Sequence, residues 1–122
     1  HAIETATEYN VCLHGEAVGC GMLIALDLSR DMGFISEQQV QRGAKIIRQA
    51  GLPTQVPAQI NSADQLLDLM AHDKKVSAGK LRLVLLRDLG DAIVTDQFDR
   101  QLLRRSIARF LKKTNYNIAL FA

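Results

Sequence analysis

The chain has 122 residues, of which 48% are hydrophobic and 23% charged, with a formal net charge of +2. This length fits one domain with a single core, and the composition excludes a disordered chain or a membrane protein. Charges of both signs are interspersed, so no nucleic-acid partner and no membrane partner is expected. Two cysteines without a C-x-x-C spacing indicate reduced thiols, and no targeting segment is visible; the cytoplasm is therefore the expected location.

The first predicted helix spans residues 16–32. Its residues are apolar nearly all the way round, which is typical of a buried helix. Gly19 and Gly21 weaken such a helix and are usually tolerated where a neighbour comes close, so close packing of its first turns is expected. Gly33 supplies a C-terminal stop.

Two further helices begin at Ser-x-x-Gln capping boxes. Ser36 with Gln39 opens a helix that reaches residue 50, and Ser62 with Gln65 opens a third one. The segment between them, residues 52–61, is expected to be an ordered loop and not a domain linker.

The last third of the chain combines a hairpin with a helix. Residues 80–86 and 92–95 have strand character and flank the turn residues 89–91, which predicts a small β-hairpin. Apolar residues at helical spacing predict a closing helix from about residue 97 to residue 113, and the tail 114–122 has no usable period. The expected fold is mainly α, with one small hairpin.

Two of the three histidines stand beside acidic residues, as in a metal or acid/base site. His1 precedes Glu4, and His14 precedes Glu16. At about 100° per residue, His1 and His14 would lie on different faces of one straight helix, so they converge only if the chain turns, for example at residues 7–10. His14 could then ligate zinc while Glu16 or Glu4 orients its ring N–H. A zinc site needs a third protein ligand, and the competing interpretation is a helix-capping or packing histidine.

Basic residues gather at two other places. Lys74 and Lys75 follow the third helix, where they are either a solvated cap that opposes the helix dipole or an anion clamp for phosphate or carboxylate. A second basic group lies on the closing helix and is interpreted as its solvated face, with no assigned role; it comprises Arg104, Arg105, Arg109, Lys112 and Lys113.

Five ordered motifs carry a family resemblance. They are His1-Ala2-Ile3-Glu4, Leu13-His14-Gly15-Glu16-Ala17-Val18 with Gly21-Met22, Ala50-Gly51-Leu52-Pro53, Asp73-Lys74-Lys75-Val76 with Gly79, and Leu81-Arg82-Leu83-Val84-Leu85-Leu86 before Gly90. In this order and spacing the chain resembles the helical, metal-binding C-terminal domain of 3-dehydroquinate synthases. The resemblance covers residues 1–111 and leaves residues 112–122 as an unmatched tail. The family's N-terminal NAD-binding domain has no counterpart in the matched residues.

The resemblance implies a carbon–oxygen lyase of the shikimate pathway of aromatic amino acid biosynthesis. The family converts the phosphorylated sugar acid 3-deoxy-D-arabino-heptulosonate 7-phosphate to 3-dehydroquinate and phosphate. It uses a divalent metal, zinc or another such as cobalt, and NAD that is reduced and reoxidised within one turnover. NAD would be bound mainly by the absent domain.

Site residues follow from the same resemblance. His14 matches a zinc ligand, and the other two ligands fall outside this chain. His1 matches a catalytic, substrate-pocket histidine. Two of three ligands and the dinucleotide domain are missing, so the isolated chain is expected to bind zinc poorly and to be inactive.

The remaining matched residues would contact or support the substrate site. Lys74 and Lys75 match a D-K-K motif whose lysine contacts the phosphate side of the substrate, with Lys75 favoured over Lys74. Glu4 and Glu16 would support the residues that contact the metal or the substrate, without contacting either themselves. A face normally covered by the other domain would favour self-association, so a homodimer is one expected assembly.

Three other function classes remain open. A metal-dependent alcohol or glycerol dehydrogenase shares the two-domain plan but needs no anion clamp. Another sugar-phosphate cyclase would use nearly the same residues and differ in its product. A non-catalytic helical interaction module would show strongly salt-dependent binding to a partner or to DNA.

Overall fold

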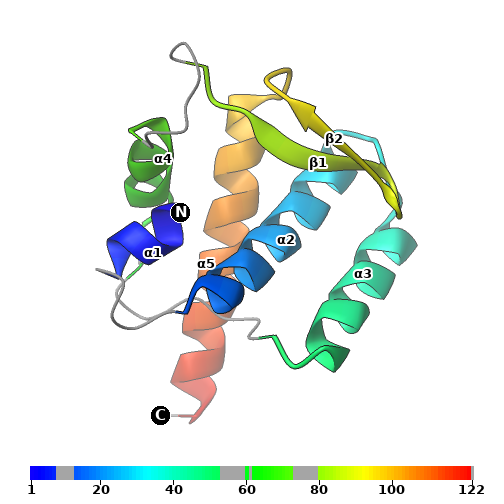
Figure 1. Cartoon of the computed structure of the whole chain (residues 1–122). Coiled ribbons are helices and arrows are strands. Elements are labelled where there is room, and N and C mark those ends of the chain that lie inside the picture. The colour runs from blue at the N-terminus through cyan, green and yellow to red at the C-terminus, as the bar shows by residue number, and fades with distance from the viewer. Residues whose placement is uncertain (8–12, 53–59, 61, 73–79, 122) are drawn as a thin grey trace.

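The computed structural model describes residues 1–7, 13–52, 60, 62–72 and 80–121, with side chains as far as residue 112. Within these ranges the chain forms five helices and one two-stranded sheet (Figure 1). In chain order these are α1 (Ala2–Ala6), α2 (His14–Asp31), α3 (Glu37–Gln49), α4 (Ala63–Ala71), β1 (Leu83–Asp88), β2 (Asp91–Thr95) and α5 (Arg100–Phe121). The prediction of a mainly helical fold with a hairpin is confirmed.

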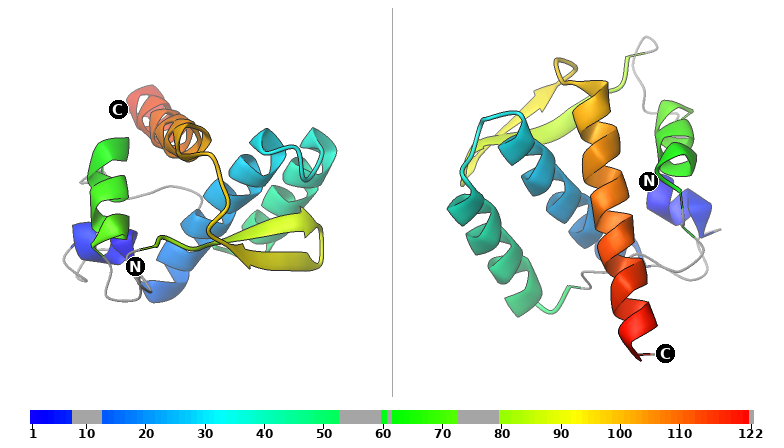
Figure 2. Two further views of the ribbon diagram at one scale, coloured as in Figure 1. Left: turned by 90° about the horizontal axis from the view of Figure 1, so that it is seen from above. Right: turned by 180° about the vertical axis from the view of Figure 1, so that it is seen from behind.

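Helix α2 is the central element of the fold. It packs against α3, β1, α5 and α1, while α4 packs against α1 and α5. Figures 1 and 2 show α3 on one side of α2, the pair α1 and α4 on the other, α5 behind, and the hairpin across one end. Every other described element except α4 and β2 therefore takes its position from α2.

Two helices differ from the predicted elements. A short helix, α1, carries residues 2–6, where none was predicted. The Thr5 and Thr7 hydroxyls donate to the carbonyls of His1 and Ile3. At the other end, α5 begins at Arg100, because the Asp99 side chain accepts the Gln101 backbone N–H at 2.8 Å. The same helix continues to residue 121, beyond the predicted end at residue 113.

The core has two parts, one on each side of α2. The main cluster joins α1, α2, α4, β1 and α5, and its buried members are Ile3, Ala17, Cys20, Leu28, Ile60, Leu66, Leu85, Leu103, Ile107 and Leu111. The smaller cluster of Leu26, Ile35 and Ile47 lies between α2 and α3. An apolar helix is needed here because α2 buries side chains in both directions.

A close approach of two helices at a glycine occurs at Gly43 of α3, which was not predicted. A Cβ added at Gly21 of α2 would meet nothing within 4 Å, whereas one at Gly43 of α3 would lie 2.9 Å from a methyl carbon of Leu26. The first turns of α2 are packed as expected at Ala17, Gly19 and Cys20, which are buried, while Gly21 faces open space. Gly43 is the residue that lets α3 approach α2.

The hairpin is attached to α2 through a buried serine. Strands β1 and β2 are antiparallel, with Leu85 opposite Ile93, and Gly90 takes a positive φ of 84° in the turn. The fully buried Ser29 hydroxyl donates to the Ala25 carbonyl at 2.6 Å and accepts the Leu86 backbone N–H at 3.0 Å. This one hydroxyl joins the central helix to the sheet.

No helix within the described ranges is both long and apolar enough to cross a membrane.

Candidate functional site

Two histidines far apart on different elements meet at one place. His1 lies directly before α1 and His14 is the first residue of α2, and their ring centroids are 6.5 Å apart with an interplanar angle of 41°. The two histidines therefore lie close together, as the sequence allowed if the chain turns between them; residues 8–10 of the expected turn lie outside the described residues. One cluster holds two imidazoles, one directly before α1 and one at the start of α2.

A buried carboxylate anchors one of these rings. Glu4 Oε1 lies 2.9 Å from His14 Nδ1, and the side chain of Glu4 is 12% exposed against 69% for His14. The acidic residue is held within α1 beside Ile3, which belongs to the main core. The exposed imidazole of His14 is therefore held by the carboxylate of Glu4, which is itself largely buried.

Glu16 has a different partner. Its Oε1 accepts the backbone N–H of Leu13 at 3.0 Å, across the first turn of α2. This is the acidic half of a capping box, and it satisfies a backbone donor next to the helix N-terminus. Its contact is with backbone and not with an imidazole.

The predicted anion clamp cannot be located. Lys74 and Lys75 both lie outside the described residues, as does Asp73. His72, which ends α4, uses its Nδ1 locally, 2.7 Å from the Asp68 carbonyl oxygen.

The described part of the chain supplies an incomplete set of metal donors. Among these residues no group of three His, Cys, Asp or Glu side chains could hold a metal ion. The imidazole of His14 has a carboxylate, that of Glu4, at its Nδ1. A hydrogen bond to a carboxylate is a common way in which proteins orient a histidine that ligates a metal. The donor set of the described residues fits a single ligand position of a metal site.

His1 is one of the residues that line an apolar cavity of about 700 Å³. Most of the remaining lining is aliphatic, including Val18, Met22, Ile46 and Val84. Val18 and Met22 are 43% and 39% exposed, so α2 is not buried on this side as its sequence predicts. Apart from His1, the described lining offers mainly hydrophobic contact.

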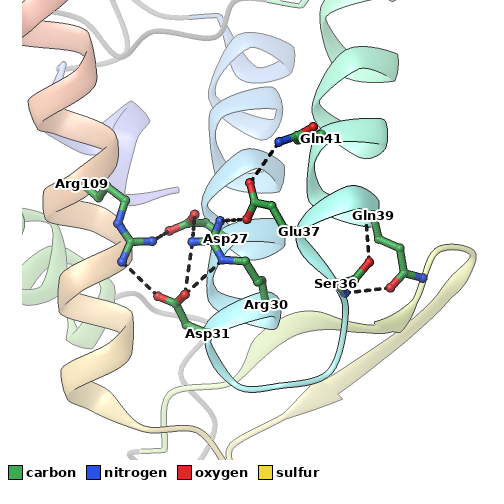
Figure 3. Close-up of polar contacts among 8 residues, drawn as sticks. All are labelled: Asp27, Arg30, Asp31, Ser36, Glu37, Gln39, Gln41 and Arg109. Atoms are coloured by element: carbon green, nitrogen blue, oxygen red, sulfur yellow. Dashed lines mark hydrogen bonds and ion pairs between the residues drawn. The ribbon is translucent and has the colours of Figure 1, made fainter.

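Sequence reasoning missed a cluster of charges that joins three helices. The α2–α5 charge cluster consists of Asp27, Arg30 and Asp31 of α2, Glu37 of α3 and Arg109 of α5 (Figure 3). Arg109 donates to Asp27 at 2.6 Å and to Asp31 at 3.2 Å, and Arg30 donates to Glu37 at 2.6 Å. Burial opposes the charge of Arg30, but the hydrogen bond to Glu37 and the charge of Asp27 outweigh it and raise the pKa of Arg30.

Arg109 and Arg104 therefore do more than form a solvated face. Arg104 makes two hydrogen bonds to Asp64 of α4, at 2.9 and 3.1 Å, and this pairing lowers the pKa of Asp64. Each of these two arginines of α5 thus contacts a neighbouring helix. The signal available in the sequence was the acidic pair Asp27 and Asp31, which lie one turn apart on an otherwise apolar helix.

Asp27→Asn is expected to lower the free energy of unfolding by about 1–2 kcal/mol, because it leaves two partly buried guanidinium groups short of a charged acceptor. Chemical denaturation of the 122-residue chain measures this change. Asp64→Asn is the matched control: its pair with Arg104 also joins α5 to another helix, but the side chains are 69% and 60% exposed. Little change is expected there, and equal effects of the two substitutions would contradict a special role of the charge cluster.

Comparison with known proteins decides the family. The family model described as 3-dehydroquinate synthase C-terminal matches residues 1–76. The chain belongs to this family. Curated relatives named 3-dehydroquinate synthase are similar to it at high identity: 49% over 107 residues in Pseudomonas fluorescens SBW25 and 50% over 107 residues in Azotobacter vinelandii. The corresponding enzyme of Pseudomonas aeruginosa LESB58 is 50% identical over 103 residues.

The match covers most of this chain and little of each relative. For the Pseudomonas fluorescens and Azotobacter vinelandii 3-dehydroquinate synthases it spans 88% of the chain and 29% of the relative, and for the Pseudomonas aeruginosa enzyme 84% and 28%. The chain therefore spans less than a third of the length of these curated relatives. A domain boundary at residue 111 stays a prediction, and helix α5 runs across that position.

Proposed function

We propose that this chain forms the C-terminal part of a 3-dehydroquinate synthase, a lyase that converts 3-deoxy-D-arabino-heptulosonate 7-phosphate to 3-dehydroquinate and phosphate in the cytoplasm. The observation that carries the proposal is the pairing of His1 with a carboxylate-backed His14 in a chain 49% identical to enzymes of that name. In those relatives the activity belongs to a polypeptide more than three times as long as the matched segment.

In this proposal His14 is one protein ligand of a divalent metal, zinc or a similar ion, and the remaining ligands come from outside the chain. When bound, the metal would act as a Lewis acid on substrate oxygens and NAD would accept and return a hydride. His1, whose ring centroid lies 6.5 Å from that of His14, is close enough to contact the same substrate and to hold or move a proton there. Lys74 or Lys75 would neutralise the phosphate of the substrate.

A chimera tests this function directly. Residues 1–111 would replace the corresponding segment of the Pseudomonas fluorescens 3-dehydroquinate synthase, and release of inorganic phosphate from the sugar-acid phosphate would be followed with NAD and zinc present. Turnover within about tenfold of the unmodified enzyme is expected, since a functional segment should cost no more than ~1.4 kcal/mol of transition-state stabilisation.

The identity of the product separates the proposal from its nearest alternative. NMR of the product should show 3-dehydroquinate, and a different ring would favour another sugar-phosphate cyclase. A chimera that folds and binds NAD but releases no phosphate would overturn the proposed function.

A further inference from the structure

We infer that Glu4 is a positioning residue that holds His14 as the Nδ1–H tautomer and thereby leaves Nε2 as the nitrogen that binds the metal. The metal half of this inference rests on the proposed function. The tautomer half rests on the geometry of this chain alone.

The geometry makes the carboxylate the fixed partner of the pair. Glu4 Oε1 is 2.9 Å from His14 Nδ1, which is within the range of an N–H···O hydrogen bond. Glu4 projects from α1, whose Ile3 is packed in the main core, and its side chain is only 12% exposed. The ring of His14 is 69% exposed and therefore takes its orientation from Glu4.

The chemistry of the two groups then assigns the proton. An ionised carboxylate only accepts hydrogen bonds, so the ring nitrogen facing it must carry a hydrogen. In a neutral imidazole the other nitrogen then has a free lone pair, and only that nitrogen can ligate a metal ion. Glu4 thus determines both the direction in which the ring presents its lone pair and the atom that carries it.

Glu16 does not share this role, although it lies only two residues from His14. Its Oε1 is 3.0 Å from the Leu13 backbone nitrogen and caps α2. Glu16→Gln is therefore a matched control: it changes the charge of the neighbouring glutamate without changing the group that faces Nδ1.

Nitrogen NMR of the 122-residue chain tests the tautomer. At an alkaline pH, where imidazole is neutral, the ¹⁵N shifts of His14 should show a protonated Nδ1 and an unprotonated Nε2. Glu4→Gln should increase the Nε2–H population, because an amide can donate as well as accept. Glu16→Gln should leave the populations of His14 unchanged. A predominant Nε2–H tautomer in the unmodified chain, or no response to Glu4→Gln, would overturn the inference.

Zinc affinity of the chimera, measured by competition with a chelator, tests the consequence for the metal. Glu4→Gln should weaken zinc binding about 10- to 100-fold, as loss of an outer partner of a ligating histidine does, and Glu16→Gln should weaken it far less. If His14→Ala lowers zinc affinity and Glu4→Gln does not, the role of Glu4 is wrong and the ligand assignment stands. If His14→Ala has no effect on zinc affinity, the proposed metal ligand itself is wrong.

Discussion

Replacing His14 by alanine in the chimera is expected to remove tight zinc binding and, with it, phosphate release. A catalytic zinc site usually has three protein ligands, so losing one leaves too few to hold the ion in its geometry. The loss of affinity should exceed the ~10–100-fold that removal of an outer-shell partner causes. Chelator competition and a phosphate-release assay on the same protein preparation measure both effects.

His1→Ala is the informative comparison, because its ring lies beside that of His14 and is assigned to the substrate. Zinc affinity should stay close to that of the unmodified chimera, while turnover falls about 10²- to 10⁴-fold, as removal of a positioned proton-transfer group does. If His1→Ala removed zinc as thoroughly as His14→Ala, both histidines would be ligands, and the division of roles between them would be wrong.

Leu28→Ala is expected to produce a large loss of stability, about 3–4 kcal/mol of unfolding free energy. Leu28 lies in the last turn of the central helix, is 1% exposed and belongs to the main cluster that α2 shares with β1 and α5. Removing its isobutyl group loses apolar burial and leaves a cavity among rigidly packed neighbours. Since small domains have only about 5–15 kcal/mol of stability in total, chemical denaturation should show a much lower midpoint.

Ser106→Ala controls for the general sensitivity of this core. Ser106 is fully buried on α5, and within the described residues its hydroxyl has no hydrogen-bond partner. Removing that oxygen relieves a buried polar group, so stability should be unchanged or slightly higher. A loss at Ser106 comparable to the loss at Leu28 would mean that the core responds to any change, and the cavity argument would not hold.

Much of the fold could be predicted because its signals are local. The Ser36–Gln39 capping box, the apolar run of α2 and the turn around Gly90 each depend on residues within one or two turns of one another. Helix α1 was missed because five residues are too few to show a helical period. Its stability comes from packing against α4, which the local sequence does not reveal.

For the candidate site, the sequence named residues but not their contacts. His14 and the two glutamates were identified, yet Glu4 and Glu16 were equivalent in the sequence because each stands near a histidine. Only the arrangement of α1 against α2 distinguishes them, with Glu4 facing the ring and Glu16 facing the backbone. The roles of His1, Lys74 and Lys75 toward substrate stay predictions.

By itself, the sequence of this protein indicated its family and its helical class and named candidate site residues, since these signals depend on residue types and their spacing along the chain. Tertiary structure alone decided which glutamate contacts His14, that Gly43 and not Gly21 permits close helix packing, and that Arg109 joins α5 to α2. The physical reason is the same in each case. These contacts join residues on different elements, and their distances depend on how the helices pack and not on the separation of the residues along the chain.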